Sequence, residues 1–518
     1  MQLTQGIHRA ANISPDKAAL VSLERTVSWA EFKDRIARLA GGFRELGVAP
    51  GERIAMLAGN SDRYVEYYFA TLWAGAVMVP VNTRWTTQEI AACLNDAAAV
   101  LLLVDAEHCG WADELREQCP ALRQILLAAA DDDHGLVSTE TLIRAAAPAP
   151  DAVRHNDDLA ALFYTGGTTG RAKGVMLSHA NLMANSLTAM ANMNISGATI
   201  HLHVSPMFHV AGGARLFSVT VAGGTHAVIP TFEPSLFLGA LERFRVTLTV
   251  VVPTMLNRLV NHPGLGDYDL SCLDMLSYGA SPMPEALLER AMALFPDVRF
   301  LQSYGMTELS PVATVLEPRF HVFDGPDAGF VRSAGRPVYN ADIVILDVDG
   351  NSLEDGEVGE ICVRGPMVMR GYWQQPELTA QTLRGGWMHT GDAGYIGERG
   401  FLFLVDRIKD MIVTGGENVY SAEVENVLYQ HPAIAECAVI GIPSADWGEA
   451  VHAVVTLRPG MTVSTQDLFS HCRSRIAGYK CPKSFDVRDI DLPKSGAGKI
   501  LKVELRRPFW DGESRSIN

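Results

Sequence analysis

The first half of the chain contains an apolar segment that is followed at once by glycines, threonines and two basic residues. It reads Leu162-Phe163-Tyr164-Thr165-Gly166-Gly167-Thr168-Thr169-Gly170-Arg171-Ala172-Lys173-Gly174-Val175. The apolar residues predict a buried strand. Small residues let neighbouring backbone N–H groups turn toward one anion, so the remainder predicts a phosphate-binding loop. It is not a Walker A loop, because glycine instead of Ser or Thr follows Lys173.

Helix and strand signals alternate on the N-terminal side of this loop. Strands are predicted at 53–58 and 76–81, with a helix at 62–73 between them. Such alternation predicts parallel sheets covered by helices. Residues 129–157 contain three consecutive aspartates and an Ala-Pro repeat, so we expect a surface loop there.

Composition restricts the class of protein. The chain has 518 residues, a formal net charge of −16 and 48% hydrophobic residues, which predicts a folded protein of roughly three domains. The acidic balance argues against a nucleic-acid partner. Eight cysteines without CxxC spacing or a secretory signal are typical of reduced thiols. No apolar run reaches the roughly 20 residues of a membrane span, so we expect a cytoplasmic protein with no transmembrane segment.

Five further motifs follow the loop in order. They are Tyr304-Gly305-Met306-Thr307-Glu308, Thr390-Gly391-Asp392, Asp406-Arg407-Ile408-Lys409-Asp410, Gly415-Gly416-Glu417-Asn418 and Pro493-Lys494-Ser495-Gly496-Ala497-Gly498-Lys499. Together they resemble the adenylate-forming superfamily, which includes acyl-CoA synthetases, adenylation domains of peptide synthetases and luciferases. The resemblance covers nearly the whole chain. One departure is Gly166, where many members have Ser.

The resemblance implies an α/β fold with two domains. A large N-terminal domain, residues 1–408, is expected to bind ATP and the acyl group, with parallel-rich sheets covered by helices and a barrel-like part. A small mobile α+β domain follows at 409–518. Lys409 is the expected hinge, since one or two residues can absorb the backbone change of a domain rotation.

The resemblance also implies an ATP site. Its expected residues are Thr165, Gly166, Gly167, Thr168, Thr169, Gly170, Lys173, Gly279, Ala280, Ser281, Tyr304, Gly305, Thr307, Asp392, Arg407 and Lys499. Thr307 and Glu308 are expected to be catalytic, with Glu308 holding Mg²⁺. Tyr304 would stack on adenine, and Asp392 suits the ribose because a carboxylate accepts hydrogen bonds from a diol. Lys499, also catalytic, would bridge the substrate carboxylate and the α-phosphate during adenylation.

An acyl pocket is expected beside Pro206-Met207-Phe208-His209-Val210-Ala211-Gly212-Gly213. Its residues are His209, Val210, Ala211, Gly212, Ser303 and Val312, and His209 is expected to be catalytic beside the substrate carboxylate. An open apolar pocket suits an alkyl or aryl chain. The stretch has no Asp to pair with an amino group, which argues against an amino-acid substrate. Arg215 is expected to face solvent; an inward orientation would instead admit a second substrate carboxylate.

The resemblance places coenzyme A at Gly415, Gly416, Trp447 and Tyr479, with Cys481 where similar ligases have a cation. The expected function is that of an ATP-dependent acyl-CoA synthetase, with ATP, Mg²⁺, CoA and a small carboxylic acid as cofactor and substrates. The acid is a medium- or long-chain fatty acid or an aryl acid. The alternatives are transfer of the acyl group to a carrier protein or other acceptor, and a non-catalytic nucleotide-binding regulator. A homodimer is an open option.

Overall fold

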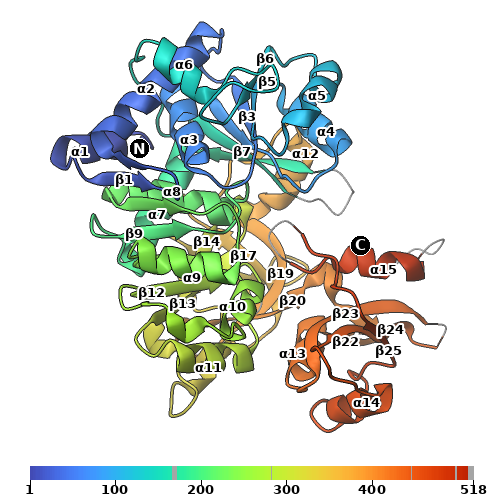
Figure 1. Ribbon diagram of the computed structural model, residues 1–518. Helices are drawn as coiled ribbons and strands as arrows, with labels where there is room; N and C mark the ends of the chain where they lie inside the picture. The colour runs from blue at the N-terminus through green and yellow to red at the C-terminus, as the bar shows by residue number, and fades with distance from the viewer. Residues whose placement is uncertain (166–171, 282, 445, 496–498, 511–518) are drawn as a thin grey trace.

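The computed structural model describes residues 1–165, 172–281, 283–444, 446–495 and 499–510 (Figure 1). The expected ATP-binding residues Gly166, Gly167, Thr168, Thr169 and Gly170 lie outside these ranges. Among the described residues, no helix has the length and apolar character needed to cross a membrane.

The first large sheet contains the strand that precedes the glycine-threonine loop. Its order is β18-β8-β7-β4-β3-β5-β6. The strands are β3 (Arg53–Leu57), β4 (Val77–Pro80), β5 (Ala99–Val104), β6 (Gln124–Leu127), β7 (Leu159–Thr165), β8 (Lys173–Ser178) and β18 (Gly371–Tyr372). Strands β3 to β7 pair in parallel, and β8 and β18 are antiparallel additions. The predicted strands at 53–58 and 76–81 therefore lie side by side, and every residue of β5 is buried, as in a sheet covered on both faces.

The second large sheet has the order β15-β14-β13-β12-β11-β9-β10-β1-β2. Its strands are β1 (Ala18–Val21), β2 (Thr26–Ser28), β9 (Ile200–His203), β10 (Thr225–Val228), β11 (Leu248–Val251), β12 (Met275–Gly279), β13 (Arg299–Gly305), β14 (Val312–Leu316) and β15 (Arg336–Pro337). The run from β10 through β13 is parallel. In such sheets ligands bind beyond the carboxyl ends of the strands, and the predicted ATP-site residues Gly279 and Tyr304 stand at those ends.

Helices pack on both sheets (Figure 1). They are α1 (Gln5–Ile13), α2 (Trp29–Glu45), α3 (Asp62–Ala74), α4 (Thr87–Ala97), α5 (Ala112–Gln118), α6 (Thr139–Ala145), α7 (His179–Met193), α8 (Val210–Ala222), α9 (Pro234–Arg243), α10 (Pro253–Val260), α11 (Glu285–Leu294) and α12 (Pro376–Thr382). Helix α8 packs against α1 and α7 and is buried along most of its length. Its surroundings therefore leave little of it in contact with solvent.

The prediction that 129–157 is only a surface loop was wrong, because the segment contains helix α6. The Ser138 side chain accepts a hydrogen bond from the Thr141 backbone N–H and so caps the helix. Ile143 is buried, and Glu140 forms a 2.7 Å ion pair with Arg35 of α2. Packing on α2 therefore orders a helix that the aspartates and prolines around it conceal.

Two smaller sheets complete the chain. An antiparallel sheet contains β16 (Asp342–Leu346), β17 (Gly359–Arg364), β19 (Met388–Ile396) and β20 (Leu402–Arg407). The last sheet contains β21 (Ile412–Thr414), β22 (Glu417–Val419), β23 (Ile434–Ser444), β24 (Gly448–Leu457) and β25 (Ser484–Arg488), with helices α13 (Ser421–Tyr429), α14 (Thr465–Arg473) and α15 (Lys502–Trp510). Figure 1 shows these orange-to-red elements gathered beside β19 and β20. The predicted α/β class, with a small α+β C-terminal part, is confirmed.

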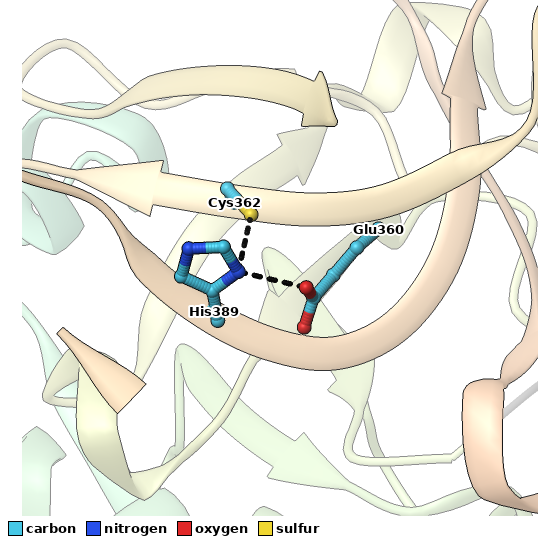
Figure 2. A group of neighbouring side chains, drawn as sticks. All are labelled: Glu360, Cys362 and His389. Carbon is cyan, nitrogen blue, oxygen red and sulfur yellow. Dashed lines mark hydrogen bonds and ion pairs between the residues drawn. The ribbon is translucent and has the colours of Figure 1, made fainter. Parts of the chain in front are cut away.

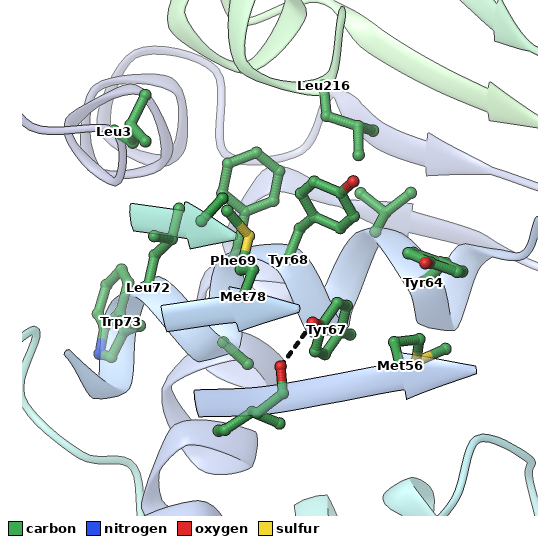
Figure 3. Close-up of a cluster of buried hydrophobic side chains, with 14 of the residues drawn as sticks. Leu3, Met56, Tyr64, Tyr67, Tyr68, Phe69, Leu72, Trp73, Met78 and Leu216 are labelled. Carbon is green, nitrogen blue, oxygen red and sulfur yellow. Dashed lines mark hydrogen bonds between the residues drawn. The ribbon is translucent and has the colours of Figure 1, made fainter. Parts of the chain in front are cut away.

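An aromatic core on α3 supports the segment that carries the predicted acyl pocket (Figure 3). Tyr67 donates a 2.7 Å hydrogen bond to the Ile54 carbonyl and so joins α3 to β3. The neighbouring Tyr68 donates a 2.6 Å hydrogen bond to the Met207 carbonyl, two residues before His209. Both rings are fully buried. The packing of α3 thus reaches directly to the residues that precede α8.

Replacing Tyr68 with Phe tests this support. We expect a loss of about 1–3 kcal/mol in the free energy of unfolding, because the buried Met207 carbonyl loses its hydroxyl donor. Tyr64→Phe is the matched control: its hydroxyl is equally buried but has no hydrogen-bond partner among the described residues, so the control should be neutral or stabilising. Urea unfolding measures both changes, and equal destabilisation by the two variants would contradict the assignment.

Candidate active site

The ends of the glycine-threonine loop are fixed by a pair of antiparallel strands. Thr165 at the end of β7 is opposite Lys173 at the start of β8. The Lys173 ammonium lies over the Tyr372 ring, 5.4 Å from its centroid, an attractive cation–π geometry. The Tyr372 hydroxyl in turn donates a 2.8 Å hydrogen bond to Glu308. One tyrosine therefore links the cation of the predicted phosphate loop to the predicted Mg²⁺ ligand.

Glu308 lies in a short 3₁₀ helix, Thr307–Leu309, that follows β13. Glu308 is only 7% exposed, and its backbone carbonyl accepts a hydrogen bond from the Met369 N–H. Burial, followed by the charge of Glu308, raises the pKa of Tyr372, so this phenol stays a hydrogen-bond donor. A buried carboxylate beside a phosphate loop is the kind of ligand that Mg²⁺ takes together with phosphate oxygens. These residues fit that ion.

Tyr304 and Asp392 are directly bonded. The Tyr304 hydroxyl donates a 2.8 Å hydrogen bond to Asp392 Oδ2, and Arg407 Nε lies 3.4 Å from Asp392 Oδ1. Strand pairing sets this arrangement, because Asp392 in β19 is opposite Arg407 in β20. Burial and then the Asp392 carboxylate raise the pKa of Tyr304 well above its usual value. The Tyr304 hydroxyl and Arg407 therefore hold the Asp392 carboxyl group in one orientation, and the two separate motifs did not predict this contact.

The predicted adenine-side residues follow β12. Gly279 is opposite Ser303 in β13, and a Cβ at Gly279 would clash with the Ser303 carbonyl oxygen. Ala280 then takes a left-handed backbone conformation with φ of +67°. Only glycine allows the two strand ends to approach this closely, so the edge opposite Tyr304 is formed by backbone as much as by side chains.

A partly buried set of three side chains supports the Thr-Gly-Asp turn (Figure 2). Glu360 accepts a 3.0 Å hydrogen bond from the Gly391 N–H and a 2.7 Å bond from His389 Nδ1. Cys362 Sγ lies 3.3 Å from the same ring nitrogen. Residues of these types can also hold a metal ion, but both Glu360 oxygens already accept protein hydrogen bonds. The set therefore fixes the turn that presents Asp392, a support that sequence reasoning missed.

Cys362 and His389 face each other on neighbouring strands, β17 and β19. Burial, followed by the Glu360 charge, raises the pKa of the Cys362 thiol to about 12. The thiol is therefore protonated at neutral pH and behaves as a packing group rather than a nucleophile. The signal that could have revealed this set is the alternation of Glu360 and Cys362, but it becomes visible only with the strand register.

Hydrogen bonds join Ser495 to Lys499, the predicted catalytic lysine. Ser495 N–H donates a 2.7 Å hydrogen bond to the Lys499 carbonyl, and the Lys499 N–H returns a 3.2 Å bond to the Ser495 hydroxyl. Arg84, which lies between β4 and α4, donates a 2.8 Å hydrogen bond to the Ser495 carbonyl. The C-terminal loop is thereby attached to the large N-terminal part.

The Lys499 side chain lies in the electrostatic field of the predicted ATP site. Burial, followed by the Arg407 cation, lowers the pKa of Lys499 to about 8, although Asp392 and Glu308 act in the opposite direction. The ammonium is therefore mostly protonated at pH 7. The structure brings the predicted lysine together with the predicted ribose and Mg²⁺ carboxylates.

His209 stands immediately before α8, where its carbonyl accepts hydrogen bonds from the Gly212 and Gly213 N–H groups. Burial, and then the cations of Lys499 and Arg84, lower the pKa of His209 to about 4. The imidazole is neutral at physiological pH, and its Nε2 has no hydrogen-bond partner among the described residues. It is thus free to bond a substrate oxygen.

The first turn of α8 carries the predicted pocket residues Val210, Ala211 and Gly212. Ser303 lies across the sheet in β13, with a buried hydroxyl that has no partner among the described residues. Val312 is buried in β14 and pairs with Gly305. The predicted pocket residues therefore come from the start of α8 and from two neighbouring strands of the second large sheet.

The expectation that Arg215 faces solvent was wrong. Arg215 is 4% exposed, because α8 is enclosed by neighbouring helices and the sheet and offers no solvent side at this position. The sequence pattern did not reveal this, since a single arginine in an apolar helix is most often at the surface.

The predicted CoA residues lie on the C-terminal part. Gly415 and Gly416 form the turn between β21 and β22 with φ of +60° and +83°. A Cβ at Gly415 would lie 2.7 Å from the Trp447 ring, so glycine permits this contact. Trp447 and Tyr479 are 53% and 41% exposed, whereas Cys481 is fully buried and offers no surface for a phosphate.

Lys409, the predicted hinge, lies in a 3₁₀ turn, Ile408–Asp410, between β20 and β21. The adjacent Asp410 forms a 2.9 Å ion pair with Arg506 of α15. Arg407, on the N-terminal side of Lys409, lies 3.4 Å from Asp392 of the predicted ATP site. Lys409 therefore lies between Arg407, which contacts the predicted ATP site, and Asp410, which contacts the C-terminal helix α15.

Removing the Glu360 carboxylate tests the support of the Thr-Gly-Asp turn. Glu360→Ala leaves Gly391 N–H and His389 without their acceptor, and we expect a loss of about 1–3 kcal/mol in the free energy of unfolding. Arg384→Ala is the control, because Arg384 contacts the same carboxylate at 3.3 Å from an exposed position and should change stability by less than about 1 kcal/mol. Denaturant titration compares the two; a larger effect of Arg384→Ala would refute the assignment.

Comparisons with known proteins identify the family. Residues 7–373 match the AMP-binding enzyme family, and residues 423–499 match the AMP-binding enzyme C-terminal domain. A feruloyl-CoA synthase of an Amycolatopsis species is 40% identical over 506 residues, which are 97% of this chain and 98% of that protein. The fatty acid–[acyl-carrier-protein] ligase ScoC of Streptomyces coeruleorubidus is 36% identical over 98% of this chain and 96% of its own.

A solved structure shows the same fold. The o-succinylbenzoate CoA synthetase of Bacillus subtilis, in complex with its acyl-adenylate intermediate, superposes with a TM-score of 0.85 at 31% identity, covering 96% of this chain and 97% of that one. The family match and the relatives agree with the order of the motifs along the chain. The chain therefore belongs to the AMP-binding enzyme family, within the adenylate-forming superfamily that its motifs resemble, and is an AMP-forming acid–thiol ligase.

Proposed function

We propose that the protein is an ATP-dependent acyl-CoA synthetase that joins a carboxylic acid to AMP and then to coenzyme A. The observation that carries the proposal is the position of Lys499. Its ammonium comes from the C-terminal part and lies in the field of Glu308 and Asp392, while its charge also reaches His209. This is the arrangement that the first half-reaction requires.

In the first half-reaction the substrate carboxylate attacks the α-phosphate of ATP, and pyrophosphate leaves. Two anions must approach, so a positioned cation lowers the barrier. Lys499 supplies that cation, and Thr307 donates to the α-phosphate. Lys173 and Thr165, at the ends of the glycine-threonine loop, contact the β- and γ-phosphates. Mg²⁺, held by Glu308, would neutralise phosphate charge.

The nucleoside is held on the opposite side of the phosphates. Tyr304 stacks on adenine, and Gly279, Ala280 and Ser281 border the other face of the ring. Asp392 accepts hydrogen bonds from the ribose hydroxyls; its orientation is already fixed by the Tyr304 hydroxyl and Arg407. The neutral imidazole of His209 lies beside the substrate carboxylate.

In the second half-reaction the CoA thiol attacks the acyl carbonyl, and AMP leaves. We propose that residues 409–518 rotate about Lys409 between the two steps. The rotation withdraws Lys499 and brings Gly415 and Gly416 toward the pantetheine arm. Exposed aromatic rings bind adenine well, so Trp447 and Tyr479 are the proposed contacts for the CoA nucleotide and favour CoA over a carrier protein.

The acid is proposed to be an aryl acid in preference to a medium- or long-chain fatty acid. Ser277 and Ser303 have buried hydroxyls without partners among the described residues, and both lie on the sheet face that α8 covers. An alkyl chain would leave these hydroxyls unsatisfied, which is costly, whereas a substituted ring can bond them. The similarity of the chain to a feruloyl-CoA synthase supports the preference for an aryl acid over a fatty acid.

A panel of carboxylic acids tests the function. We expect AMP and acyl-CoA to form only when ATP, CoA and a suitable acid are all present, with aryl acids ahead of saturated fatty acids. Pyrophosphate exchange without any acyl-CoA product would instead favour a carrier protein or another acceptor. If the protein binds nucleotide but shows no pyrophosphate exchange with any acid of the panel, the non-catalytic regulator would be favoured.

Lys499→Ala separates the two half-reactions. We expect the adenylation rate to fall at least about 100-fold, because a positioned charge is lost from the transition state, while thioester formation from supplied acyl-adenylate persists. Lys494→Ala is the matched control, since Lys494 lies in the same loop but pairs with Glu436 at 2.5 Å. Adenylation should survive in this control. An equal loss of both half-reactions in Lys499→Ala would refute its assigned role.

The pKa of Lys499 also sets a pH dependence. The protonated ammonium is the active form, so kcat/KM for ATP should be level below about pH 8 and fall tenfold per pH unit above it. Lys499→Arg should remove this decline from whatever adenylation it retains, since guanidinium stays protonated. Initial rates of adenylation between pH 6 and about 10 measure the effect. A decline unchanged in Lys499→Arg would assign it to another group.

A further inference from the structure

A small cavity lies between α8 and strand β9, next to the predicted acyl pocket. Its lining includes Ala211, Gly212 and Arg215 from the helix, and His201, His203 and Ser205 from the strand and the residues after it. Its volume of about 10 Å³ accommodates one water-sized group. Ala211 and Gly212 also belong to the predicted acyl pocket, so the cavity adjoins the region predicted to hold the acyl group.

Arg215 brings an uncompensated charge to this cavity. Its Nε and Nη1 are buried and have no hydrogen-bond partner among the described residues, and within the same ranges it forms no ion pair. Burial lowers the pKa of Arg215 only to about 10, so the guanidinium remains a cation at neutral pH. Buried charges in proteins are normally paired. Arg215 has no anionic partner among the residues that the structure describes.

The side chains opposite Arg215 include neutral histidines beside the apolar Leu202, Val204 and Val250. Both ring nitrogens of His201 and Nδ1 of His203 are buried without partners among the described residues. Burial, and then the charges of His203 and Arg215, lower the pKa of His201 well below its usual value. The cavity therefore contains one fixed cation and hydrogen-bonding imidazoles, which together suit an anion and suit a hydrocarbon end poorly.

Helix geometry fixes where such an anion would lie. Arg215 follows His209 by six residues, which is about 9 Å along a helix axis. Helical side chains lean toward the N-terminus, and the Arg215 guanidinium accordingly lines a cavity that Ala211 and Gly212 share. An anion at Arg215 is thus separated from a carboxylate at His209 by less than the length of a long fatty chain.

We propose that Arg215 binds a second carboxylate, located at the far end of the acyl substrate, and so makes the enzyme selective for a short aliphatic or aryl dicarboxylic acid. The proposal rests on the proposed CoA-ligase function and narrows its substrate. His209 receives the carboxylate that is adenylated, and Arg215 with His201 receives the one that is not. Only acids whose two carboxylates match this spacing fill both positions.

Matched substrates and an isosteric variant test the proposal. Each dicarboxylic acid of a length series is compared with its mono-amide, which has the same shape without the second charge. The wild-type enzyme should prefer the diacid by at least about tenfold in kcat/KM. Arg215→Met should lower kcat/KM for the diacid at least about tenfold, mainly through KM, and should lower it by a smaller factor for the mono-amide; Arg215→Lys should recover part of the preference.

Thermal unfolding gives a readout that does not need turnover. Ligand-free Arg215→Met should unfold at a higher temperature than the wild type, because an unpaired buried charge is removed; a merely structural arginine would give the opposite result. A saturating diacid should raise the unfolding temperature of the wild type but not that of Arg215→Met. Equal shifts in both proteins would overturn the proposal.

The possible outcomes distinguish failure of the Arg215 proposal from failure of the proposed acyl-CoA synthetase function. Turnover of mono-acids with no diacid preference would overturn the role of Arg215 and leave the CoA-ligase function standing. Absence of acyl-CoA and of pyrophosphate exchange for every acid would refute the function. The unfolding shifts would then still decide whether Arg215 binds a dicarboxylate.

Discussion

The desolvated ammonium of Lys499, in the electrostatic field of the Glu308 and Asp392 carboxylates, is the interaction on which the proposed adenylation site depends. A cation removed from water needs nearby negative charge, and two different parts of the chain supply it. A tyrosine hydroxyl holds each carboxylate: Tyr372 donates to Glu308, and Tyr304 to Asp392. Protein hydrogen bonds thus hold both carboxylates in place, so the proposed adenylation step would need little reorganisation of them.

The acyl side of the site is fixed by ordinary core packing. Asn60 accepts a 2.8 Å hydrogen bond from the Met207 N–H and donates a 3.0 Å bond to the Ser205 carbonyl. Tyr68 holds the Met207 carbonyl from the other side. The backbone leading to His209 is therefore bonded at several points by residues of the α3 region. Because these contacts lie in the aromatic core, the stability of the first sheet and the position of His209 are linked.

Short local motifs explain how much of this could be predicted from the sequence. The glycine-threonine loop, the Thr307-Glu308 pair and the loop before Lys499 each consist of a few consecutive residues, so they can be recognised in the sequence alone. The Tyr304–Asp392 bond joins residues 88 positions apart, and the support of Gly391 by Glu360 depends on a strand register. The burial of Arg215 depends on what surrounds α8. None of these contacts leaves a pattern in the nearby sequence.

Helix α8 joins the proposed catalytic residue His209 to the proposed specificity residue Arg215. His209, just before its first turn, is kept neutral by burial and by the cations of Lys499 and Arg84, whereas Arg215, less than two turns later, stays charged in an equally dry environment. Because a helix is rigid over this length, the two groups cannot adjust their spacing to fit a longer or shorter acid. Substrate length would have to change through the opposing strands, whose polar face carries His203, Ser277 and Ser303.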